Sequence, residues 1–182
     1  EKRQLAPVFA STVNQLVEGM QQLNRSYPVG VVWVDERDEA RVTSRRLHRL
    51  VAEYGLVPGH KLLVPEKVIQ GSEDMQRGFL QALFTADGHV EGFSEKGVSV
   101  RLTSTSAFLL TDVQRLLLNF GIVSQIYTSR RGEGFRSMPD GHGGRKDYLC
   151  KAYHDLVVSK TNLWVFAKEI GFLVDYKNAT LV

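Results

Sequence analysis

The sequence predicts an α+β protein built from two related halves. Three observations support this: a helix with well-marked ends in the middle of the chain, runs of β-branched and aromatic residues typical of strands, and a strand–turn–helix pattern that occurs twice. At 182 residues the chain can form one compact domain or two small halves that share a core. Its 43% hydrophobic and 24% charged residues are typical of a globular protein, so we expect a packed core.

The N-terminal third is predicted to alternate helices and strands. Residues 5–23 carry apolar side chains at helical spacing, and residues 31–34 form a β-branched and aromatic run. A second short strand is predicted over residues 41–43. Ser44 can then cap a helix that ends at Gly55, a residue suited to the left-handed position after a helix.

A sequence repeat supports the two halves. Residues 41–44 (Arg-Val-Thr-Ser) recur as residues 101–104 (Arg-Leu-Thr-Ser), each at the end of a predicted strand. In both copies a helix follows and stops at an aromatic-Gly-aliphatic-Val sequence, at residues 54–57 and 120–123, and residues 166–172 are a partial third copy. Chance similarity between strand–turn–helix units is the alternative.

Residues 71–88 are predicted to form a helix. Ser72 is a good N-cap, and Gly88 is a good terminator. Asp87 lies in the last turn, where the negative end of the helix dipole disfavours a carboxylate. Its position therefore predicts a compensating positive charge, although Asp87 could instead cap a turn with Gly88, as Asp-Gly pairs often do.

The same helix carries a ridge of small residues. Gly78, Ala82 and Ala86 follow at intervals of four positions and would let another helix approach closely. If two such helices pack along these ridges, their terminal carboxylates meet and need a cation between them. Magnesium suits hard oxygen ligands and keeps waters that can attack a phosphate.

Residues 80–88, Leu-Gln-Ala-Leu-Phe-Thr-Ala-Asp-Gly, resemble the motif that names the LAGLIDADG homing endonucleases, including those embedded in inteins. The departures are Gln81, Ala82 and Thr85, of which Thr85 stands where the family usually has an acid. The resemblance implies two pseudo-symmetric αββαββα-like halves whose antiparallel sheets bind DNA. It also implies that Asp87, with the adjoining Gly88, binds a catalytic Mg²⁺ or Mn²⁺ ion.

The resemblance extends to both sides of the motif. Lys61 is similar to the lysine that intein endonucleases place before their second motif, which implies a catalytic charge near the scissile phosphate. A solvated lysine in a linker is the alternative. Residues 163–173 are similar to the end of intein endonuclease regions, such as those in ribonucleotide reductases.

A first copy of the motif is not recognisable. The nearest candidate is residues 13–19, where Glu18 is a weak candidate for a second metal-binding acid. We therefore interpret residues 1–60 as a truncated or degenerate first half, residues 61–71 as a linker, and residues 72–182 as a second half with an intact motif. A homodimer that pairs two copies of the single motif is the alternative to a missing N-terminal motif segment.

Basic and polar residues predict a surface for double-stranded DNA. The net charge is +3, and basic residues gather in the glycine-containing stretch after residue 129. The resemblance implies that alternate residues of the sheet point at base edges, although an ordinary solvent-facing strand shows the same alternation. The candidate DNA-binding residues are Lys96, Ser99, Arg101, Thr103, Gln125, Tyr127, Ser129, Arg130, Arg131, Arg145, Lys146 and Lys151.

Together these features predict a Mg²⁺-dependent endonuclease that hydrolyses a long, specific duplex site, as an intein homing endonuclease region does. Because the first motif is incomplete, a non-catalytic DNA-binding protein or RNA maturase on the same fold is the alternative, and an inactive intein remnant is a further one. No apolar run approaches the roughly 20 residues that cross a bilayer, so we expect no membrane partner and a cytoplasmic, nucleoid-associated protein.

Overall fold

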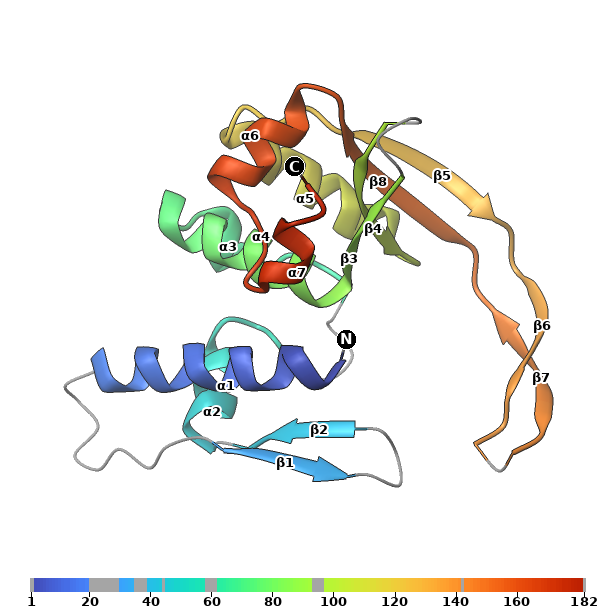
Figure 1. The fold of residues 1–182 in the computed structure, drawn as a ribbon, viewed down its shortest axis with the longest axis horizontal. Helices are drawn as coiled ribbons and strands as arrows, with labels where there is room; N and C mark the ends of the chain where they lie inside the picture. The colour runs from blue at the N-terminus through green and yellow to red at the C-terminus, as the bar shows by residue number, and fades with distance from the viewer. Residues whose placement is uncertain are drawn as a thin grey trace.

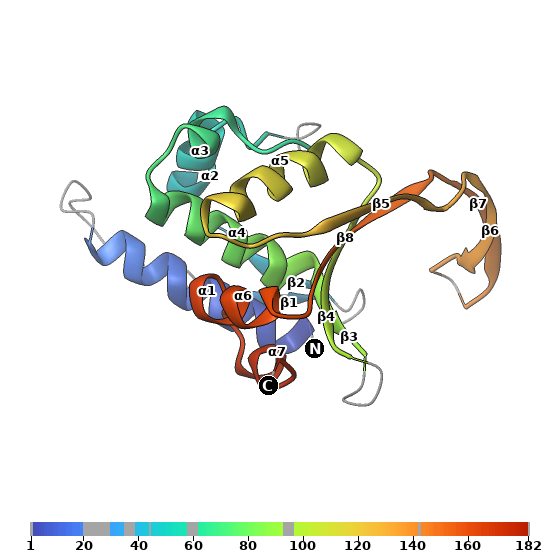
Figure 2. The ribbon, with the colours of Figure 1, turned by 90° about the horizontal axis from the view of Figure 1, so that it is seen from above.

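The computed structural model describes residues 2–19, 30–34, 39–43, 45–57, 62–92, 97–141 and 143–181, which form an α+β fold with antiparallel strands (Figures 1 and 2). Its helices are α1 (Lys2–Gly19), α2 (Arg45–Glu53), α3 (Glu66–Ile69), α4 (Glu73–Asp87), α5 (Ala107–Asn119), α6 (Asn162–Glu169) and α7 (Asp175–Asn178). Its strands are β1 (Val31–Val34), β2 (Glu39–Val42), β3 (Gly88–Glu91), β4 (Ser99–Ser104), β5 (Gln125–Arg131), β6 (Gly134–Pro139), β7 (Arg145–Cys150) and β8 (Tyr153–Ser159).

The central sheet has the strand order β3-β4-β8-β5, and every neighbouring pair is antiparallel. Alternate residues of its two middle strands are buried, namely Val100 and Leu102 on β4 and Leu156 and Val158 on β8. They form one hydrophobic core with buried residues of α4, α5 and α6. The sheet therefore has one face packed under helices and one polar face.

Aromatic rings join the motif helix to the end of the chain. Phe84 on α4 contacts Phe166 on α6 edge to face, with 5.0 Å between ring centroids, and Phe166 contacts Phe172 at 5.5 Å. Phe84 and Phe166 are completely buried. This contact fixes α4 against α6 in the centre of the core.

The predicted helix stops are confirmed. Gly55 and Gly121 adopt positive φ angles of 76° and 71°, and Gly171, in the third copy of the pattern, has a φ of 59°. After α5, the amides of Gly121 and Ile122 donate to the carbonyls of Leu118 and Leu117, at 2.9 and 3.0 Å. Only glycine takes this left-handed conformation without strain, so the repeated Gly marks a real structural element.

The ends of α4 are as predicted in position, but one differs in geometry. The Ser72 side chain accepts a hydrogen bond from the Met75 amide at 3.3 Å, as an N-cap does. Gly88, in contrast, is not left-handed: its φ of −80° and ψ of 156° lead straight into β3. A Cβ at Gly88 would lie 2.6 Å from the Phe84 carbonyl oxygen, so glycine is needed here for close approach.

Three segments contain more secondary structure than predicted. From its sequence the glycine-rich stretch 132–144 suggests a hairpin tip, but it contains strand β6, which forms an antiparallel ribbon with β7, in which Phe135 pairs with Leu149. Both faces of this ribbon meet solvent, so the sequence lacks the apolar alternation that marks a half-buried strand. The linker 61–71 contains the short helix α3, and α7 was not predicted at all.

The N-terminal segment consists of α1, the β1–β2 hairpin and α2. Leu5 and Val8 of α1 pack against the main core. Figures 1 and 2 show that α1 begins near the end of α4 and runs away from it, so the end of α1 that carries Glu18 lies far from Asp87. The expected cap at Ser44 lies outside the described residues.

Candidate functional site

The carboxylate of Asp87 is exposed at the end of α4, directly before β3, the edge strand of the central sheet. It makes no hydrogen bond or ion pair with any other described residue. Within the described ranges, no group of three His, Cys, Asp or Glu side chains could hold a metal ion. Asp87 can therefore supply one ligand to a cation, and the described residues do not place two further side chains of these types beside it.

The compensating charge predicted at the end of α4 belongs to a lysine. The Lys177 ammonium, on α7, donates to the carbonyl oxygens of Thr85 at 2.8 Å and Gly88 at 2.7 Å. A cation in this position neutralises the negative end of the helix dipole. Sequence reasoning considered only a metal ion for this role; the structure adds Lys177 at the helix end, and a metal ion at Asp87 stays a prediction.

A sequence signal for Lys177 was present in the internal repeat. Residues 42–61 align without gaps on residues 158–177, with identical residues at Glu53 and Glu169 and at Gly55 and Gly171 among others. The same alignment pairs Lys61 with Lys177. Lys61, predicted as the catalytic lysine, lies outside the described residues, and its repeat counterpart lies at the end of the motif helix.

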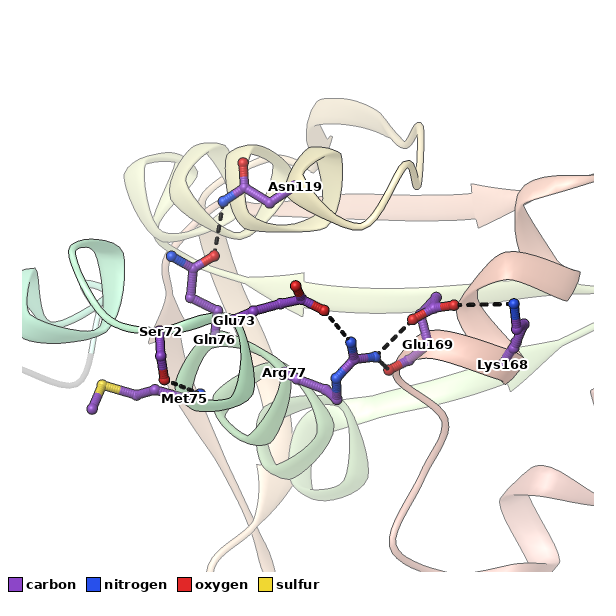
Figure 3. A network of polar contacts seen from close by, with 8 residues as sticks. All are labelled: Ser72, Glu73, Met75, Gln76, Arg77, Asn119, Lys168 and Glu169. Carbon is purple, nitrogen blue, oxygen red and sulfur yellow. Dashed lines mark hydrogen bonds and ion pairs between the residues drawn. The ribbon is translucent and has the colours of Figure 1, made fainter.

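A polar stripe on α4 holds the segment that follows α6. Gln81 donates to the Ile170 carbonyl at 2.8 Å, and the buried Thr85 hydroxyl accepts from the Leu173 amide at 2.9 Å. One turn earlier, Arg77 donates to the backbone carbonyl and side chain of Glu169 (Figure 3). Two of the three departures from the family motif, Gln81 and Thr85, thus bind the chain segment that leads to Lys177.

Arg77 is the centre of the network in Figure 3. Its guanidinium lies 2.8 Å from a Glu169 carboxylate oxygen and 2.5 Å from Glu73, and it stacks over the Phe120 ring at 4.8 Å. The hydrogen bond from Arg77 holds the pKa of the Glu169 carboxyl below its ordinary value, and the same bond raises the pKa of Arg77. Asn119 donates to Gln76 at 2.8 Å and ties α5 to α4.

The ridge of small residues on α4 remains open. Gly78 and Ala86 are exposed and Ala82 is half-buried. A Cβ added at Gly78 would meet nothing within 4 Å. Close packing of a second helix on this ridge is therefore not made by the described part of the chain, and it stays a prediction for another motif helix.

The polar face of the central sheet carries most of the predicted DNA-binding residues. Ser99, Arg101 and Thr103 alternate with the buried residues of β4, and Gln125 and Tyr127 pair with the polar-face positions of β8. The register then shifts between Tyr127 and Arg131, so strict alternation does not reach Ser129. Lys96 lies outside the described residues, and Arg145 and Lys146 lie on the exposed ribbon, with Lys151 just beyond it.

A polar hollow of about 500 Å³ lies on this face of the sheet. It is lined by His89, Glu91, Arg101, Thr103, Arg130, Tyr153 and Asp155. Sequence reasoning did not single out the two acids, Glu91 and Asp155. Asp87 lies directly before β3, the edge strand that carries His89 and Glu91 of this hollow.

Replacing Lys177 with methionine is expected to lower the free energy of unfolding by about 1–3 kcal/mol, because two carbonyls at the end of α4 lose a charged donor. Chemical denaturation measures this loss. Lys160→Met, at an exposed turn, is the matched control and should change stability by less than about 0.5 kcal/mol. Equal effects of the two substitutions would contradict the role of Lys177.

The sequence of this chain is similar to a known family and to segments of known proteins. The profile of a family described as LAGLIDADG-like domain matches residues 74–171, more than half of the chain. The chain is 32% identical over 129 residues to the alpha chain of the ribonucleoside-diphosphate reductase NrdEB of Bacillus subtilis, covering 70% of this chain and 12% of that protein. It is 37% identical over 120 residues to the DNA gyrase A protein of Mycobacterium leprae, covering 66% of this chain and 8% of that protein.

Solved structures share the fold. A mesophilic variant of the homing endonuclease I-DmoI superposes with a TM-score of 0.58 at 20% identity, over 94% of this chain and 75% of that one. I-DmoI in complex with DNA and Mn superposes with a TM-score of 0.55 at 22% identity, over 89% of this chain and 71% of that one. With a matching family profile, a motif helix that ends in an exposed acid, and this shared fold, the chain belongs to the LAGLIDADG family.

Proposed function

We propose that this chain is the DNA-cleaving part of a site-specific homing endonuclease. The observation that carries the proposal is the exposed Asp87 carboxylate, which stands where the motif helix meets a sheet with an open polar face. A twisted antiparallel sheet fits the major groove of a duplex, and its polar side chains can reach base edges. The solved complexes of I-DmoI with target DNA support this reading.

The relatives favour an intein setting. The chain spans only 12% of the matched reductase protein and 8% of the matched gyrase protein, two enzymes of unrelated activity. A segment shared by such different proteins is best explained as an inserted element, as an intein endonuclease region is. We therefore propose that the chain acts on duplex DNA, in a cell compartment where DNA is accessible.

The donor set fits a divalent cation in part. An exposed carboxylate with no protein partner among the described residues suits Mg²⁺ or Mn²⁺, because Mg²⁺ binds through one or two carboxylates and keeps several waters. When bound, such an ion supplies an activated water and stabilises charge on the phosphate. Asp87 would provide one ligand, and the open ridge at Gly78 would receive the second motif helix that brings another acid.

Other residues of the chain position this acid. Thr85 and Gln81 fix the segment after α6, and that segment carries Lys177 to the end of α4. In its observed place the ammonium neutralises the helix end, which makes a second negative group, a phosphate, easier to bring close to Asp87. These contacts determine where Asp87 stands relative to bound DNA.

A non-catalytic DNA-binding protein or RNA maturase is the second candidate. It is favoured by the finding that the described residues form no cluster of three potential metal ligands. On that reading the sheet still binds nucleic acid and the phosphodiester bond stays intact.

A plasmid assay separates the candidates. The test substrate is a supercoiled plasmid that carries the coding sequence of the gene in which this segment is inserted, with the segment itself removed. The plasmid should be nicked or linearised with Mg²⁺ or Mn²⁺, and should stay intact with EDTA. Binding of the same site is followed by gel shift in the presence of Ca²⁺. Binding without cleavage in any metal would identify the non-catalytic candidate, and cleavage unchanged by EDTA would contradict the metal-dependent site.

A further inference from the structure

Two arginines on the polar face of the sheet are held in the same way. Arg101, on β4, directs its Nε to a Glu91 carboxylate oxygen at 2.6 Å. Arg130, on β5, directs its Nε to an Asp155 carboxylate oxygen at 3.6 Å. Both arginines and both acids line the polar hollow of about 500 Å³.

This arrangement leaves the outer edge of each guanidinium available. Among the described residues, the terminal nitrogens of Arg101 and Arg130 have no hydrogen-bond or ion-pair partner. Arginine has five N–H donors in a fixed fork, so an acid on Nε still leaves a pair of parallel donors on the terminal nitrogens. The same pair of donors matches O6 and N7 of guanine in the major groove.

The Asp155 side chain is buried in the sheet and held in place by a hydrogen bond. Its side chain is only 10% exposed, and its second oxygen accepts from the Thr103 hydroxyl at 2.7 Å. Asp155 also pairs with Thr103 on β4 and with Tyr127 on β5 in the strand register. The acid is therefore a fixed support that limits where Arg130 can point.

The backbone of β5 is bent to bring Arg130 to this support. The register shifts between Tyr127 and Arg131, and Ser129 has a φ of 51°, rare for a residue other than glycine. The Ser129 amide donates to Nδ1 of His154 at 3.1 Å, which satisfies the donor freed by the irregular pairing. Irregularities of this kind re-aim a side chain, and here Arg130 lies over the Tyr127 ring at 5.6 Å.

We propose that Arg101 and Arg130 are guanine-reading residues and that Glu91 and Asp155 are the positioning residues that aim them. An acid on a DNA-binding face repels phosphates, so two acids in this hollow lower non-specific affinity. The two acids weaken non-specific binding and also hold the arginines in position to contact base edges. Both effects increase the difference in affinity between the correct site and other sequences. The inference rests on the proposed duplex-binding function and assigns its base preference to four side chains.

Selection from a randomised duplex library, followed by competition binding on purified protein, tests the proposal. The wild type should enrich guanine at two positions of its site. Arg130→Ala and Asp155→Asn should lose preference at the same position, by roughly 5- to 150-fold, and Arg101→Ala and Glu91→Gln at the other. The double variant Arg130→Ala with Asp155→Asn should lose no more than either single variant, because the two act as one unit.

Matched controls separate positioning from charge. Asp147→Asn, on the exposed ribbon, removes the same charge and should leave both preferences intact. Thermal unfolding reports whether the Asp155→Asn variant remains folded. The Glu91 side chain is 54% exposed, so Glu91→Gln tests the positioning role of an acid at a position where loss of the fold is not expected. Equal loss of affinity for all sequences in Arg130→Ala would show a phosphate contact and overturn the proposal, as would an unchanged guanine preference in both acid variants. If the wild type binds no duplex, the proposed function itself fails.

Discussion

Replacing Asp87 with asparagine is expected to reduce DNA cleavage by about 10³-fold or more while leaving DNA binding intact, because a lost metal ligand removes several kcal/mol of transition-state stabilisation. Asparagine keeps the shape of the side chain and removes only the charge. The carboxylate is exposed and has no partner among the described residues, so the fold should not change. Single-turnover cleavage of the bound site measures the chemical step, and gel shift in Ca²⁺ measures binding.

Asp74→Asn is the matched control for this substitution. Asp74 is an exposed acid in the first turn of the same helix, at the opposite end from Asp87. Its loss should cost about 0.3–1 kcal/mol of stability through the helix dipole and should not slow cleavage. Full cleavage by Asp87→Asn, or equal damage from both variants, would remove Asp87 from the site.

Replacing Phe84 with alanine is expected to lower the free energy of unfolding by about 3–5 kcal/mol, because it leaves a cavity in the centre of the core. Phe84 is completely buried and forms an edge-to-face contact with Phe166 at 5.0 Å between centroids. It also fills the space beside Gly88, where the helix turns into β3. Denaturant unfolding followed by circular dichroism measures the loss.

Phe108→Ala serves as the control, since Phe108 is on α5 and its residue surface is 78% exposed. This substitution should change stability by no more than about 0.5 kcal/mol. If Phe84→Ala lowered the free energy of unfolding by less than about 1 kcal/mol, the α4–α6 contact would not be a main source of core stability. In that case the placement of Asp87 would have to depend on the polar contacts alone.

The motif helix and the ends of several helices were predictable because interactions between residues close in the sequence determine them. The Ser72 cap depends on a hydrogen bond to Met75, three residues away, and the stops at Gly55 and Gly121 depend on a backbone angle that glycine adopts without strain. The strand at residues 31–34 was also predicted with the observed bounds. In contrast, residues 132–144 were predicted only as a hairpin tip and not as a strand of the β6–β7 ribbon, because both faces of the ribbon are exposed and carry no core pattern.

The sequence by itself therefore determined the α+β class, the motif helix and the acid at its end, since each depends on neighbouring residues. Only the tertiary structure decided which distant groups the charged side chains contact. Lys177 donates to the Thr85 carbonyl, 92 positions away in the sequence, and Asp155 accepts a hydrogen bond from Thr103, 52 positions away. The internal repeat singles out Lys177 but not the groups it contacts, because contacts at such separations depend on how α6 and β8 pack into the common core.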